Sequence, residues 1–258
     1  MIRIVVICFS ALLLITVYAS VEDPQTPLNN AQRIEQYYQK NKGDSLPSKI
    51  HGTEAAGTLD RAKLLPFSSG NFRYFDTMSY LSGHAFMSDK MQQTLLASYK
   101  ELEVTAPGRI FTYMESGLQN GGIIPGHRTH QNGLSVDLMV PLVKDGQPYY
   151  KFDTIGGWHY GLEFDDKGRW MNDSTISIDF NLLGLQILSL DKQARKLGYH
   201  IKKVILKLEL KDDFYATVNG KSVRRKGIYL AMNLPPNVNK QHDDHFHVDF
   251  EMVPAVPK

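Results

Sequence analysis

Two short stretches of this 258-residue chain, more than a hundred residues apart, hold five of its nine histidines. The first, GHRTHQNGLSVD (126–137), has two histidines three positions apart and ends in an aspartate. The second, HDDHFHVDF (242–250), has three histidines within six positions. Histidine side chains bind metals and carry protons. We therefore expect a fold that brings the two stretches together around a group that needs imidazole.

Each stretch runs into the pattern of a β-strand. In residues 134–139 the even-numbered positions are Leu, Val and Leu, and Asp137 stands at an odd position. In residues 245–250 the even-numbered positions are Phe, Val and Phe, and His245 and His247 stand at odd positions. Because successive side chains of a strand point to opposite faces, the first pattern predicts a half-buried strand with Asp137 off its apolar face. The second predicts a closing strand with both histidines on one face.

These positions suit a metal site. Zinc in a catalytic site takes three protein ligands, accepts imidazole and carboxylate together, and keeps one position open for water. His130 and Asp137 would reach one ion if Gly133 lets the chain turn between them, and His247 would supply the third ligand. His245 would then stand beside the ion, where it can act as a general base or stabilise a charged intermediate.

Each residue also has an ordinary interpretation. A lone histidine is usually a surface residue or a hydrogen-bonded core residue, and two alternating histidines fit an exposed polar strand face. His127 and His242 would form an outer ring around the site. The metal interpretation is favoured because both stretches supply ligand types on the non-core face of a strand.

The other periodic segments define the fold class. Residues 89–103 and 180–197 read as helices, the second capped by Asp179 and stopped by Gly198. Residues 140–168 read as a surface segment. Further strand candidates are 109–114 and 201–210. Strands interleaved with two helices predict an α+β fold, with a small antiparallel sheet that carries the zinc site, flanked by helices and long loops.

The first residues read as an export signal. MIRIVVICFSALLLITVYAS has an early Arg3, a long apolar run and small residues at its end, the layout of a cleaved signal peptide over 1–19. The alternative, an uncleaved anchor, is disfavoured because the run is short for a bilayer of roughly 30 Å. Cys8 is the only cysteine, so the mature protein would have no disulfide and no cysteine nucleophile. Export to the periplasm is the expected localisation.

Residues 20–50 read as a polar N-terminal extension with a short helix near 31–40, followed by the main domain over 51–258. A net charge of +2, without long runs of one sign, implies neither a nucleic-acid partner nor, once the signal is removed, a membrane partner. A serine nucleophile is disfavoured because no G-x-S-x-G is present. Function should therefore lie in the histidine site.

The two histidine stretches resemble those of a known superfamily. The H-x6-D from His130 to Asp137, with the H-x-H from His245 to His247, is similar to the metallopeptidases that include lysostaphin, D-alanyl-D-alanine peptidases and the hedgehog signalling domain. More narrowly, GHRTHQNGLSVD, HDDHFHV and the earlier GTLDRAKLLPFSSGNFRYF resemble penicillin-insensitive murein endopeptidases. The likeness spans roughly residues 52–251.

The resemblance implies one zinc ion held by His130, Asp137 and His247, and an endopeptidase that cuts D-alanyl-diaminopimelyl or diaminopimelyl-diaminopimelyl cross-links of peptidoglycan. It makes His245 the catalytic histidine, and it makes His127 and His242 further active-site histidines, with His242 the next candidate for the base.

Two other residues near the first stretch are candidates for the site. Arg128 is a candidate for binding a substrate carboxylate, although a plain surface arginine explains it equally well. Glu115 is a candidate for orienting a histidine, or a polar strand residue.

Two departures and two alternatives accompany this expectation. Members of the murein endopeptidase branch carry disulfides, which this mature chain would lack, and the family's further Asp-x-x-His has no counterpart, because Asp179 is followed by Phe, Asn and Leu. A D-alanyl carboxypeptidase with the same metal site, or a non-catalytic zinc- or cell-wall-binding domain, remains open.

Overall fold

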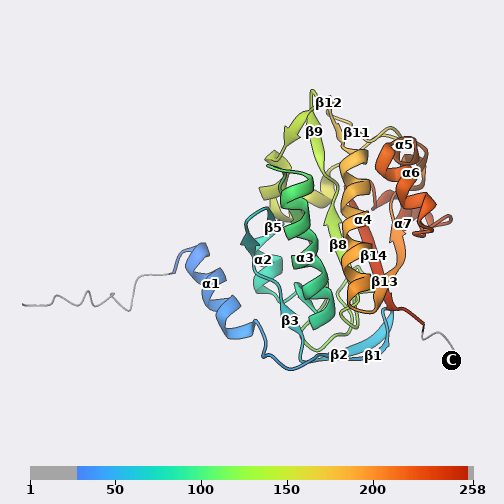
Figure 1. The fold of residues 1–258 in the computed structure, drawn as a ribbon. Helices are drawn as coiled ribbons and strands as arrows, with labels where there is room; N and C mark the ends of the chain where they lie inside the picture. Colours follow the sequence, from blue (N-terminus) through green and yellow to red (C-terminus); the bar gives the residue numbers. More distant parts are fainter. Residues whose placement is uncertain (1–27, 255–258) are drawn as a thin grey trace, which may run out of the picture.

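Residues 28–254 are described by the computed structural model, and they form a mixed α+β fold (Figure 1). The signal-peptide prediction for 1–19, with Cys8, lies outside the described residues. Within 28–254 no helix combines the length and the apolar character needed to cross a bilayer.

A six-stranded sheet forms the centre of the fold. Its strand order is β13-β14-β8-β7-β5-β4. The bounds are β13 Tyr199–Ile205, β14 His245–Met252, β8 Ser135–Met139, β7 Phe111–Tyr113, β5 Phe72–Tyr74 and β4 Ser68–Ser69. The predicted sheet was antiparallel, but β5 and β7 pair in parallel, with Phe72 opposite Phe111. The other pairs are antiparallel.

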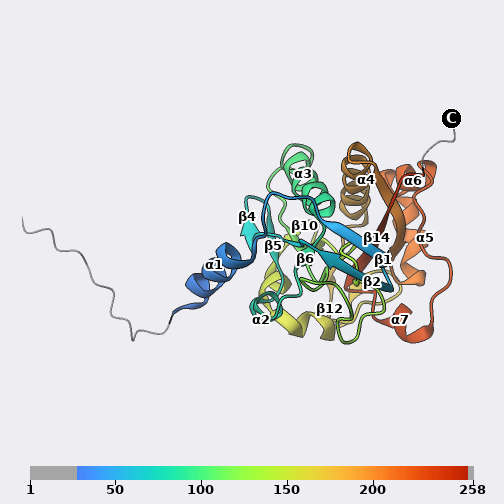
Figure 2. The ribbon, with the colours of Figure 1, turned by 90° about the horizontal axis from the view of Figure 1, so that it is seen from below.

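Three smaller sheets surround the central one. A hairpin of β1 (Lys49–Thr53) and β2 (Ala56–Asp60) lies at one end of the molecule, at the bottom of Figure 1 and toward the viewer in Figure 2. The second joins β3 (Lys63–Leu64) to β6 (Phe86–Met87). The third has the order β10-β9-β12-β11, with bounds Gln147–Tyr149, Leu142–Lys144, Asp173–Ile178 and Arg169–Trp170.

Two long helices lie side by side on one face of the central sheet (Figure 1). They are α3 (Asp89–Thr105) and α4 (Phe180–Lys196), as the apolar periodicity predicted. The Oγ atoms of Ser98 and Ser189 hydrogen-bond between them at 3.0 Å. Asp179 caps α4 by accepting from the N–H of Leu182 at 2.9 Å, and Gly198 follows the helix with a φ of +81°. Both predicted helix ends are therefore confirmed.

The remaining helices are short. They are α1 (Asn30–Asn41), α2 (Thr77–Leu81), α5 (Lys211–Ala216), α6 (Val218–Arg225) and α7 (Pro236–Lys240), with 3-10 turns η1 (Lys151–Thr154), η2 (Gly156–Gly161) and η3 (Leu208–Leu210). The helix predicted near 31–40 is confirmed as α1. The ring of Tyr37 on α1 packs edge-on against Tyr80 with centroids 5.8 Å apart, so this part of the extension is draped over the domain.

Three local predictions need correction. Strand β8 is buried on both faces rather than half-buried, because its polar face lies beneath the loops that close the histidine site. The strand predicted over 201–210 ends at Ile205 and continues into η3. The surface segment predicted over 140–168 contains two strands and two 3-10 turns and buries Asp153 and His159, which no periodicity indicated.

Candidate metal centre

The two histidine stretches meet on neighbouring strands at the centre of the sheet. Strands β14 and β8 pair antiparallel with His247 directly opposite Asp137. His245 lies opposite Met139. Phe246 and Val248 are fully buried in the core, so the alternation puts both histidines on the other face. This confirms the prediction that one face of the closing strand carries the pair.

A tight turn before β8 delivers His130. Its φ is +71°, in the left-handed region that few residues other than glycine adopt. Gly133 also has a positive φ, +75°, and a Cβ there would lie 2.7 Å from the backbone nitrogen of Ser88. Only glycine fits this position. The turn that Gly133 was predicted to allow is therefore present, and the strain at His130 is of the kind found at functional sites.

Four side chains converge below this turn. The Nε2 atoms of His127 and His130 each lie 3.3 Å from Asp137 Oδ2. The Nδ1 of His247 lies 2.7 Å from Asp137 Oδ1 and 3.1 Å from His130 Nε2. His127, His130 and Asp137 offer donor atoms that all lie within 4.8 Å of one another, so they can hold a metal ion. His127, predicted in an outer ring, therefore lies in the inner group.

Burial and charge set the protonation of this group. Burial alone raises the pKa of Asp137, but the surrounding histidines, His130 first, outweigh it and hold that pKa well below its usual range. Burial lowers the pKa of His130, although the negative charge of Asp137 acts to raise it. Burial also opposes the charged form of His247, yet Asp249 and Asp137 raise its pKa to about 10. An ionised carboxylate beside a neutral imidazole is a donor set that fits a divalent cation.

His247 is held from behind by a residue whose role the sequence did not reveal. Asp249 Oδ1 lies 2.7 Å from His247 Nε2 and accepts from the Ser135 hydroxyl at 2.6 Å. Lys203 forms an ion pair with its other oxygen at 3.0 Å. A carboxylate behind a histidine is the common way in which proteins orient a metal ligand.

His245 stands beside the group with its own carboxylate. Its Nδ1 donates to Asp244 Oδ1 at 2.5 Å. Burial opposes its charged form, but Asp244 outweighs burial and raises the pKa of His245 to about 9. The ring of His242 lies 4.8 Å away, centroid to centroid. Burial lowers the pKa of His242 to about 4, so the two neighbouring imidazoles are charged differently near neutral pH.

A tyrosine that the sequence did not single out completes the surroundings. The ring of Tyr160, on η2, meets that of His245 edge-on at 5.7 Å, and its hydroxyl donates to Glu115 Oε2. Glu115 also accepts from the Ser79 hydroxyl at 2.9 Å. Glu115 was expected to orient a histidine or to be a polar strand residue; its Oε1 lies 3.9 Å from Nδ1 of His84, and its Oε2 holds Tyr160. The irregular backbone of η2 gave no periodic signal that could have identified Tyr160.

The group lies in a pocket of about 850 Å³. Arg128 lines it with positive charge, Lys240 is ion-paired there with Glu163 at 3.4 Å, and Tyr229 and Leu234 add apolar surface. Arg128 is exposed, which suits its expected contact with a substrate carboxylate. The β1–β2 hairpin closes one side, where Glu54 lines the pocket and its carbonyl accepts from the N–H of Gln131 at 3.0 Å.

The fold therefore carries a buried His/His/Asp group that is able to hold a metal ion. This group opens to a large pocket, and a further histidine lies beside it. No protein-family model matches this chain, and no curated protein matches it. The function must therefore be inferred from the chemistry of the site.

Proposed function

We propose that this protein is an exported zinc peptidase that hydrolyses peptide cross-links in peptidoglycan, at D-alanyl-diaminopimelyl or diaminopimelyl-diaminopimelyl bonds. The observation that carries the proposal is the combination of a buried His/His/Asp group with His245 beside it, at the wall of one pocket. A structural zinc site is usually closed by four protein ligands and has no need of an adjoining base.

Zinc is the proposed ion because it accepts imidazole nitrogen and carboxylate oxygen together. His130, Asp137 and His247 would hold it, so that His247 takes the place of His127 in the His127–His130–Asp137 group described above. His130 and His247 are almost completely buried, and His247 is fixed by Asp249, whereas His127 is partly exposed. When bound, zinc lowers the pKa of a water molecule toward about 7 and polarises a carbonyl.

His245 is the proposed proton carrier. Its Nδ1 is held by Asp244 at 2.5 Å, which leaves Nε2 to exchange a proton with a reacting group. The same carboxylate raises the pKa of His245 to about 9, so near neutral pH the ring is charged and Nε2 has a proton to donate. A positioned carboxylate stabilises a charged histidine in the same way in many hydrolases.

Arg128 provides positive charge on the pocket wall, whereas the charge of Lys240 is paired with Glu163 at 3.4 Å. Stem peptides of peptidoglycan carry free carboxylates, and a guanidinium binds a carboxylate through paired hydrogen bonds. The large, partly apolar pocket suits a peptide chain on both sides of the bond that is cut.

The test is digestion of purified, cross-linked muropeptide dimers by the mature protein loaded with zinc, followed by chromatography. We expect dimers to become monomers. Release of D-alanine without loss of dimers would make the protein a carboxypeptidase, and neither product would make it a binding domain. N-terminal sequencing of the protein from the periplasm should begin near residue 20; a mature protein that keeps Met1 in the cytoplasm would contradict export.

A further inference from the structure

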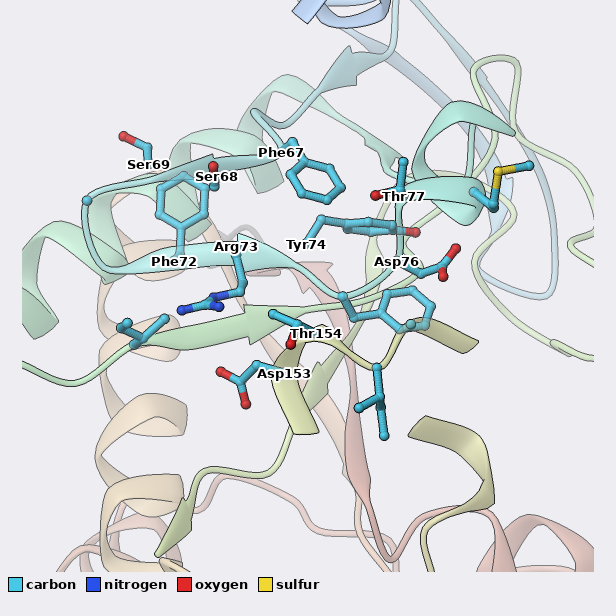
Figure 3. A pocket seen from close by; sticks show the side chains of 16 residues that line it. Phe67, Ser68, Ser69, Phe72, Arg73, Tyr74, Asp76, Thr77, Asp153 and Thr154 are labelled. Atoms are coloured by element: carbon cyan, nitrogen blue, oxygen red, sulfur yellow. The ribbon is translucent and has the colours of Figure 1, made fainter. Parts of the chain in front are cut away.

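A second pocket, of about 660 Å³, opens beside the β4–β5 hairpin and η1 (Figure 3). It shares no lining residue with the histidine pocket. Its wall combines aromatic side chains, among them Phe67 and Phe72, with three charged side chains, which are Arg73 from β5, Asp153 from η1 and Asp76. A concave apolar surface with a few polar groups is the usual form of a small-ligand site.

The side chains of Arg73 and Asp153 face the same cavity but do not form a salt bridge with each other. Figure 3 shows the Arg73 guanidinium and the Asp153 carboxylate turned to the same side of the pocket. Arg73 favours the ionised form of Asp153 through space, but the two form no salt bridge within 4.0 Å in the described chain. Asp153 is 8 % exposed, and the hydroxyl of Thr112 donates to its Oδ2 at 3.1 Å, which leaves Oδ1 without a donor among residues 28–254.

An arginine and an aspartate in this arrangement present complementary partners to one small molecule. A guanidinium binds a carboxylate through two parallel hydrogen bonds, and a carboxylate accepts from an ammonium group. A ligand that carries both groups on one carbon would engage both side chains. The aromatic rings of Phe67 and Phe72 would then contact the rest of the ligand.

We propose that this pocket binds the zwitterionic end of an amino acid, with the ligand carboxylate on Arg73 and the ligand ammonium on Asp153. The ligand would be a free amino acid or the unlinked end of a diamino acid in a peptide. The choice of diaminopimelate as one ligand rests on the proposed function, since its unlinked end is such a zwitterion; the pocket itself does not depend on that function.

The second pocket adjoins the histidine pocket, because residues that line the one contact residues that line the other. Phe75 lines the second pocket and Tyr160 lines the histidine pocket, and their rings meet edge-on at 5.7 Å. Asp76, also in the second pocket, accepts from the N–H of Gly157 at 3.1 Å. The η2 turn, which carries Tyr160 to within 5.7 Å of the His245 ring, is therefore anchored on residues of the second pocket. A ligand that orders this wall should also change turnover in the histidine pocket.

Calorimetric titration of the mature protein with D-alanine and with meso-diaminopimelic acid tests the proposal. We expect saturable binding of both, weakened roughly 10- to 100-fold by Arg73→Gln or Asp153→Asn, the usual worth of a hydrogen bond to a charged group. N-acetyl-D-alanine, which lacks the ammonium, and D-alaninamide, which lacks the carboxylate, should each bind as weakly. Lys151→Gln is the matched control, since Lys151 is an exposed charge on η1 outside the pocket lining; it should bind like the parent.

The outcome is kept independent of hydrolysis by repeating the titration with His130→Ala, whose second pocket is intact. Binding that persists while this protein and its parent leave muropeptide dimers uncut would overturn the proposed function alone. Absence of saturable binding of both zwitterions to the parent, or equal affinity for the two blocked ligands, would overturn the second site alone. If Arg73→Gln fails to fold, the blocked ligands on the parent and the milder Arg73→Lys variant still decide the question.

Discussion

Asp249 lies 2.7 Å from Nε2 of His247, and this contact determines which nitrogen of the ring faces the metal group. An ionised carboxylate can only accept a hydrogen bond, so Nε2 carries a proton. Nδ1 lies 2.7 Å from a second carboxylate, Asp137, and the His247 pKa of about 10 means that Nδ1 is protonated as well in the metal-free protein. A metal ion at this position would displace the Nδ1 proton, while Asp249, two residues later on the same strand, keeps Nε2 protonated and holds the ring.

The first prediction concerns this support. Asp249→Asn should weaken zinc binding about 10- to 100-fold, the usual effect of removing a carboxylate behind a ligand, because an amide holds the ring less firmly. Competition with a chromogenic chelator measures the affinity. Asp173→Asn, which removes a partly exposed carboxylate on β12, is the control and should bind zinc like the parent. Equal affinities in all three proteins would show that Asp249 does not orient the ligand.

The second prediction separates His127 from His247, since both lie within reach of Asp137. His247→Ala should lose zinc, whereas His127→Ala should keep it, because His127 is partly exposed and its Nδ1 has no partner in the described chain. His130→Ala and Asp137→Ala should each lose the metal. Elemental analysis of the four purified variants gives the answer. Zinc retained by His247→Ala and lost by His127→Ala would assign the third ligand to His127.

The third prediction separates the two histidines of the closing strand. His245→Ala should keep the metal and the fold but lose on the order of 10²–10⁴-fold in rate, the usual contribution of a general acid or base. Zinc content and muropeptide turnover are measured on the same sample, with His247→Ala alongside. If His245→Ala turned over dimers at the parent rate, another residue would have to carry the proton, and His242 is the next candidate.

The elements that carry the histidines could be predicted because their signals are local. Alternation with period two fixes which face of a strand a residue occupies, so His245 and His247 were placed on one face before their partner strand was known. The turn at Gly133 was also predictable, because it depends on the backbone freedom of that one residue. The meeting of the two histidine stretches was the one nonlocal prediction, and the histidines themselves suggested it; the direct pairing of β14 with β8 was not predicted.

The residues that were missed depend on nonlocal packing. Tyr160 and His159 lie on an irregular turn without periodicity, and the roles of Asp244 and Asp249 arise only from what lies next to them in space. The second pocket is harder still to predict from the sequence, because Arg73 and Asp153 are far apart in it and neither belongs to a recognisable motif. The parallel pairing of β5 with β7 is likewise set by the packing of the whole domain.

The last prediction concerns the stability that Asp153 costs the folded protein. Burial raises the pKa of Asp153 from 3.8 to about 6, partly offset by Thr112 and Arg73. Below the unfolded pKa both states hold the proton, so the residue costs nothing. As the pH rises through this interval the unfolded chain ionises first, and stability falls until the folded pKa is passed. The rise from 3.8 to about 6 corresponds to about 3 kcal/mol.

Asp153→Asn removes this cost, since its amide oxygen can still accept from Thr112 and it has no charge to desolvate. The variant should therefore unfold at higher urea than the parent near pH 8, by up to about 3 kcal/mol in the free energy of unfolding, and the difference should vanish once the pH is well below the unfolded pKa of 3.8. Urea titrations of both proteins at several pH values measure it. A difference that stays constant with pH would mean that Asp153 does not ionise in this interval. The same variant is expected to lose zwitterion binding, so a more stable protein with an emptied second pocket is the combined result that the structure leads us to expect.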